Sequence, residues 1–239
     1  MGTTRSSMSA TIAAGAAAAV AASCPGGFVG YSFAIRDVES GGTAYVVVDV
    51  HASFDDPHDA VLSVFNARIE LESGGSFHHD DIFTLSGLSG HWSPVMSLTI
   101  PDAIDPEIDS FVRVGGPLGG ASTTELDPIF DPPTARTPPI DSGWFNAAPA
   151  NLQGRVDPDT LATHVARLVV ESAAAPDVLN FAANLSYESG GTTEVRYAWD
   201  DGAGSGPVAT IAIPAPPAWA MAAIGAASAR PRRRAPSSG

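Results

Sequence analysis

The chain has 239 residues, of which 26 are acidic and only 12 are basic, and its formal net charge is −14. A charge of this sign and size repels nucleic-acid phosphates and anionic lipid headgroups, so both are poor candidates for partners. The only cysteine, Cys24, excludes an intrachain disulfide, and a folded body must therefore be held by its core alone.

The first 23 residues have the layout of a secretory signal peptide. Arg5 and the amino terminus supply positive charge, an apolar stretch at 12–22 follows, and small residues offer a cleavage site. This stretch is too short for a spanning helix, and the alternative is a disordered alanine-rich leader. Residues 21–24, Ala-Ala-Ser-Cys, loosely resemble a lipobox, so attachment of a lipid to Cys24 stays open.

Between residues 24 and 210 the apolar residues recur mainly with a period of two, which is typical of half-buried β-strands. Together these runs predict an all-β body: an antiparallel β-sandwich of jelly-roll type with about nine strands. The runs lie at 28–35, 44–54, 60–71, 82–85, 95–100, 108–114, 162–171 and 207–213, with a hairpin over 178–199.

Glycine and proline divide these runs. The tetrapeptide Glu-Ser-Gly-Gly occurs at 39–42, 72–75 and 188–191, and paired glycines allow the positive φ angles of a tight reversal. Because the spacing is not periodic, we interpret it as a reused turn and not as a repeat architecture. Eight prolines interrupt 117–160, which predicts a long connection docked on one domain through Trp144, or else a linker between two small β-units.

Acidic and imidazole side chains gather at predicted strand ends. Without 1–23 and 214–239, the body keeps 7 arginines against all 26 acidic residues, a net charge of −19 that attracts divalent cations. The sequence has none of the spacings that enforce a metal site, so we expect no cofactor, with Ca²⁺ as the candidate if such side chains converge. The candidate metal ligands are His78, His79, Asp80 and Asp81.

Catalytic motifs are nearly absent. The segment 87–90 lacks a glycine of the nucleophile elbow, and the glycine-rich 115–120 has no lysine to bind phosphate. We therefore predict that the protein is not an enzyme. Trp92 and Trp144 are candidates for stacking on sugar rings, and the alternative for both is a place in the core.

The C-terminal end has the pattern of a sorting signal: a proline motif, an apolar run over 218–229, and an arginine cluster. Apolar residues partition into a bilayer, and arginines stay with its anionic cytoplasmic face. At 12 residues and about 18 Å, the run is short of a hydrocarbon core of about 30 Å, and the alternative is a frayed alanine-rich terminus. The signal residues are Pro214, Ala215, Pro216, Arg230, Arg232, Arg233 and Arg234.

This arrangement resembles the PEP-CTERM sorting domain of exported Gram-negative bacterial proteins, with Ala215 where that motif has glutamate. The resemblance implies export, transient inner-membrane anchoring through a C-terminal hydrophobic helix, and processing near the motif by an exosortase-type membrane enzyme. It also implies an association with extracellular polysaccharide and biofilm.

The sequence therefore predicts three parts: a signal peptide with its helix at 1–23, a β-sandwich body at 24–210, and a sorting tail at 211–239. The predicted function is that of an exported protein of the cell envelope or extracellular matrix with a structural or interaction role. A carbohydrate-binding, lectin-like module, with or without Ca²⁺, is the alternative. A polysaccharide-acting enzyme comes third.

Overall fold

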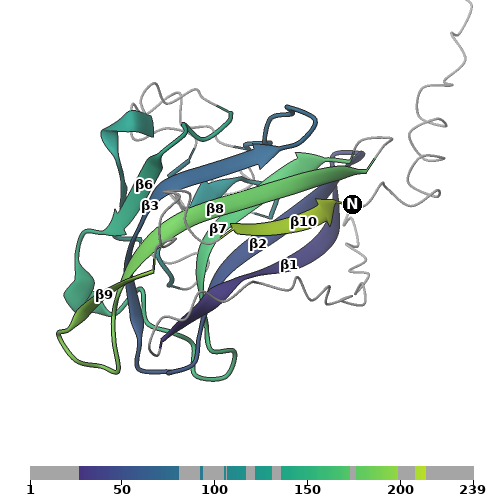
Figure 1. Cartoon of the computed structure of the whole chain (residues 1–239). Coiled ribbons are helices and arrows are strands. Elements are labelled where there is room, and N and C mark those ends of the chain that lie inside the picture. Colours follow the sequence, from purple (N-terminus) through teal and green to yellow (C-terminus); the bar gives the residue numbers. More distant parts are fainter. Residues whose placement is uncertain are drawn as a thin grey trace, which may run out of the picture.

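The body is a two-layered β-sandwich (Figure 1), which confirms the predicted all-β class. The computed structural model describes residues 27–80, 92–93, 105, 107–116, 122–130, 136–172, 176–198 and 208–213. Its strands are β1 (Phe28–Ser40), β2 (Thr43–Phe54), β3 (Ala60–Leu71), β4 (Phe111–Val112), β5 (Thr124–Leu126), β6 (Ser142–Asn146), β7 (Ala162–Glu171), β8 (Asp177–Glu188), β9 (Val195–Ala198) and β10 (Val208–Ile213). Within these ranges, helical structure is limited to two 3₁₀ turns, η2 (Pro128–Phe130) and η3 (Pro149–Asn151).

The strands form two sheets in which all neighbours are antiparallel. The smaller sheet has the order β1-β2-β7-β4, and the larger sheet has the order β10-β8-β3-β6-β5, with β9 also paired to β8. Along the chain the described strands change sheet five times: between β2 and β3, β3 and β4, β4 and β5, β6 and β7, and β7 and β8. Each sheet is therefore held by a central pair of strands far apart in sequence, β2 with β7 and β3 with β8.

The core lies between the sheets and follows from the alternation of side chains along each strand. In β2, Val46, Val48 and Val50 point inward, and in β8, Phe181 and Leu185 do the same. Each such fully buried side chain contributes about 1.5–3 kcal/mol relative to leaving it exposed. This apolar layer is the main source of stability for a chain with one cysteine.

The described body begins and ends on edge strands. Phe28, at the start of β1, pairs with Phe54 at one end of the sandwich. Ile213, at the end of β10, pairs with Asp177 at the other end, where β7 passes over to β8. The chain therefore enters and leaves the sandwich at opposite ends.

Most predicted runs match observed strands, with two differences. The run at 108–114 contains only the two-residue β4, and 117–160, which we expected to be a connection, contributes β5 and β6 to the larger sheet. Both strands are too short to show an alternating pattern in a proline-rich segment. The runs predicted at 82–85 and 95–100 lie outside the described residues.

The reused turn is confirmed as a backbone feature. Gly41 and Gly42 both have positive φ in the β1–β2 hairpin, and Gly190 and Gly191 have it between β8 and β9. In the third copy Gly74 has φ 72° after β3, where the chain turns without forming a hairpin.

Candidate functional site

The two tryptophans that the sequence offers as sugar platforms are both in the core. Trp92 is 2% exposed and packs edge-on against Phe77, and Trp144 is 1% exposed. The Trp144 indole N–H donates to the carbonyl of Arg113 at 2.9 Å. Since neither ring face reaches solvent, stacking on a sugar by these residues is ruled out in this fold, and the expectation is corrected.

The candidate metal ligands at 78–81 lie close together in sequence, but their described side chains turn to different partners. The His79 ring sits edge-on to Trp92, with Nδ1 3.8 Å from Asp109 Oδ1. The His78 ring lies against Tyr45, 4.6 Å between centroids. Asp80 Oδ2 accepts a hydrogen bond from the Asp105 N–H at 2.5 Å. Asp81 lies outside the described residues, and across the described ranges no three histidine, cysteine or acidic side chains are placed to hold a metal ion.

The acidic loop at 55–59 serves to shape the backbone. Asp56 Oδ1 accepts from the His58 N–H at 2.9 Å, and Asp55 Oδ1 accepts from the Gly27 N–H at 2.7 Å. Asp59 is fully buried and accepts from the Gly190 N–H at 2.6 Å. Burial raises the pKa of Asp59 above its usual value. The loop is thereby fastened to the β8–β9 turn.

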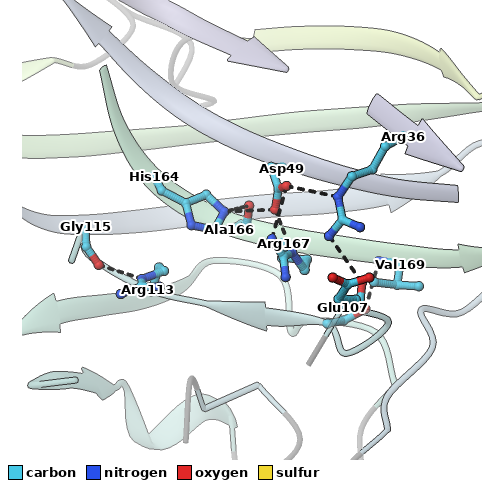
Figure 2. Close-up of polar contacts among 10 residues, drawn as sticks. Arg36, Asp49, Glu107, Arg113, Gly115, His164, Ala166, Arg167 and Val169 are labelled. Carbon is cyan, nitrogen blue, oxygen red and sulfur yellow. Dashed lines mark hydrogen bonds and ion pairs between the residues drawn. The ribbon is translucent and has the colours of Figure 1, made fainter. Parts of the chain in front are cut away.

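A polar cluster that the sequence did not predict lies on the outer face of the smaller sheet (Figure 2). The β2–β7 register places Asp49 opposite Arg167 and, after a register shift between Val50 and His51, His51 opposite His164. These side chains point away from the core because they alternate with the buried valines of β2 and with Leu168 of β7. We call these four residues the Asp49 cluster.

Asp49 is the acceptor at the centre of this cluster. Arg167 donates from Nε to Oδ1 at 2.7 Å and from Nη2 to Oδ2 at 3.2 Å. His164 Nε2 lies 3.2 Å from Asp49 Oδ1 and 2.8 Å from the carbonyl of Ala166. Because both of these neighbours are acceptors, the His164 proton is on Nε2. Arg36 of β1 adds a more distant charge, its Nε 3.9 Å from Oδ2.

The electrostatics of the cluster follow from its burial. Burial alone raises the pKa of Asp49, but hydrogen bonds from His164 and Arg167 outweigh it, so the pKa lies well below its usual value. Burial, reinforced by neighbouring His164, lowers the pKa of His51. The carboxylate therefore stays ionised, and the His51 imidazole is neutral at neutral pH.

β4 borders β7 in the same sheet, and Phe111 lies opposite Arg167. The Arg167 guanidinium lies 5.4 Å from the centre of the Phe111 ring, and the His164 ring meets Phe111 edge-on at 5.9 Å. Arg113 donates from Nε to the carbonyl of Gly115 at 2.5 Å, and burial lowers the pKa of Arg113 to about 10. The cluster thus joins β1, β2, β7 and the β4 segment.

This geometry favours a structural role for the cluster. Both Asp49 oxygens accept hydrogen bonds from Arg167, and the His164 proton is directed at protein acceptors. The sequence contains one signal of this cluster: Asp49 interrupts the apolar run of β2, and the residues on either side of it are buried. An acid in such a run requires a partner.

A second surface lies on the outer face of the larger sheet. One row of paired residues runs across four strands there: Tyr197 of β9, Ser186 of β8, Ser63 of β3 and Phe145 of β6. Phe65 lies in the adjacent row and meets Tyr197 edge-on, 6.5 Å between centroids. Tyr197 is 49% exposed and Phe145 is 42% exposed. We call these five residues the aromatic–serine face.

In comparisons with known proteins, no protein-family model matches the chain, and no curated protein or solved structure is significantly similar to it. Among the described residues, no helix is both long and apolar enough to cross a membrane. The residues of the predicted sorting motif, Pro214 to Pro216, and of the arginine cluster lie outside the described ranges.

Proposed function

We propose that the protein is an exported component of the bacterial cell envelope or extracellular matrix with a structural or interaction role. The observation that carries this proposal is where the sandwich begins and ends. Its first strand starts at Phe28 and its last ends at Ile213, just inside the two segments with sorting patterns. Removing those segments takes none of the described strands from either sheet, as release of a processed body requires.

The Asp49 cluster supports a role without catalysis. Its carboxylate is neutralised by Arg167, and the His164 imidazole proton is engaged by protein acceptors. Such a network fastens strands together in a body that has no disulfide. The proposal includes the finer parts of the architecture: a signal helix at 1–23, a hydrophobic helix in the tail, and a jelly-roll relation, which the five passages between the sheets among the described strands support.

The arginine cluster of the tail gives the first test. We expect a variant with Arg230, Arg232, Arg233 and Arg234 all changed to Gln to lose its stop at the cytoplasmic face, because the remaining run is short and rich in alanine. The measurement is the share of protein in membrane, periplasmic and released fractions of the host, followed with an antibody against the body. The released or periplasmic form should then keep its tail.

The matched control is Arg68→Gln, which removes one exposed arginine from β3 in the body. It should distribute as the unaltered protein does. An unchanged distribution and unchanged tail processing in the four-arginine variant would contradict the sorting proposal.

A further inference from the structure

We infer that the aromatic–serine face binds a neutral polysaccharide. This inference rests on the proposed interaction role and names its partner. The two rings at its ends are exposed although aromatic side chains usually supply core area. Three of the large apolar side chains exposed in the described body, Phe145, Val195 and Tyr197, are on this one side of the larger sheet.

The face has the two kinds of group that a sugar chain requires. Sugar rings have apolar C–H faces, which stack on aromatic rings, and hydroxyl edges, which exchange hydrogen bonds. Tyr197 and Phe145 supply the rings, and between them the Ser63 and Ser186 hydroxyls lie 2.7 Å apart. One hydroxyl donates to the other. Ser186 is buried, at 7% exposed, and Ser63 is half-buried, so Ser63 is the hydroxyl of the pair that offers its remaining capacity to a ligand.

The spacing fits an extended occupant. β9 and β6 are separated by β8 and β3, so the two rings are three strand spacings apart, about 14 Å. A sheet surface of this span suits a chain of several sugar units lying across the strands, with a ring near each end and the Ser63 hydroxyl beneath its middle.

The charge of the surface and of the body distinguishes a neutral polysaccharide from an anionic one. The row contains no charged side chain between Tyr197 and Phe145, and Glu125 of β5 follows next to Phe145. The body as a whole has a net charge of −19 once 1–23 and 214–239 are removed. An anionic polysaccharide is repelled at long range, whereas a neutral one meets no such barrier.

The test uses the full chain in depletion binding to microcrystalline cellulose and in affinity electrophoresis through soluble β-1,3-glucan and starch, with alginate as the anionic comparison. We expect binding to at least one neutral glucan and none to alginate. Tyr197→Ala and Phe145→Ala should each weaken that binding about tenfold, the loss of one ring contact. Because both rings are exposed, thermal melting should show that both variants remain folded.

The control is Val29→Ala, which trims an exposed apolar side chain, 50% exposed, on β1 of the other sheet. It should leave binding unchanged.

Three results would overturn the inference: no binding to any of the neutral glucans, equal binding by both ring variants and the unaltered protein, or a concentration-dependent dimer that Tyr197→Ala abolishes. Export without glucan binding defeats this inference alone, and glucan binding by a protein that stays in the cytoplasm defeats the proposed function alone.

Discussion

Replacing Asp49 by Asn should lower the free energy of unfolding by about 3–5 kcal/mol, the usual effect of removing one partner from a buried ion pair. Arg167 is 4% exposed at its side chain and donates to both Asp49 oxygens, and His164 donates to one of them. An amide there turns an N–H₂ group toward these donors. Urea unfolding at pH 7 measures the loss.

The pH dependence gives this prediction a second observable. The pKa of Asp49 in the folded protein lies below its unfolded value of about 3.9. Its contribution is therefore present above pH 4 and disappears as the pH falls through the folded pKa. The stability gap between wild type and Asp49→Asn should narrow steadily below pH 4.

The control for the Asp49 variant is Asp37→Asn on β1, where the side chain is exposed. This change should alter stability by no more than about 0.5 kcal/mol. Two results would contradict a stabilising role for the cluster. One is a loss of stability in Asp49→Asn no larger than in its control, and the other is a stability difference between wild type and Asp49→Asn that stays constant down to pH 2.

Gly154→Ala should destabilise the body by about 2–4 kcal/mol, because the added methyl has no space. A Cβ at this position would overlap the carbonyl oxygen of Val61 and come within 3.0 Å of Val114 Cγ1. Val61 cannot easily retreat, since its N–H donates to the Gly154 carbonyl at 2.9 Å. The midpoint of chemical unfolding would report the loss.

The Gly74→Ala variant tests backbone strain in the absence of steric crowding. Gly74 has φ 72°, and a methyl group added there would have no atom within 4 Å, so only the conformational penalty applies, about 1–2 kcal/mol. Gly154→Ala should therefore lower the free energy of unfolding more than Gly74→Ala does. Equal effects would mean that the close approach of Gly154 to β3 is relieved by a small backbone shift.

Period-two patterning was enough to predict the sandwich, because long strands such as β2 and β8 present one apolar face and pair with distant partners. It failed at β5 and β6, whose three and five residues give no measurable alternation. β6 takes its place in the sheet by pairing with β3, and β5 by pairing with β6; the β3–β6 pairing is a tertiary contact that no local pattern encodes.

The sites were harder to predict than the strands. Asp49 and Arg167 are 118 residues apart, and they meet only because β2 and β7 pair in one particular register. The prediction that Trp92 and Trp144 stack on sugar rings failed for a related reason. Residue type shows that a ring can stack, but whether the ring is buried depends on where the fold places it. Tyr197 and Phe145, which are exposed, carried no distinguishing sequence signal.

The most direct test of the central claim is the intact mass of the protein released by its native host, compared with the membrane-retained form. We predict a released body that lacks about the first 23 residues and everything beyond about Pro214, so that the sandwich from Phe28 to Ile213 remains whole. A mass gain at Cys24 would instead identify a lipoprotein. A released protein that retains its arginine tail, or a full-length protein confined to the cytoplasm, would contradict the account.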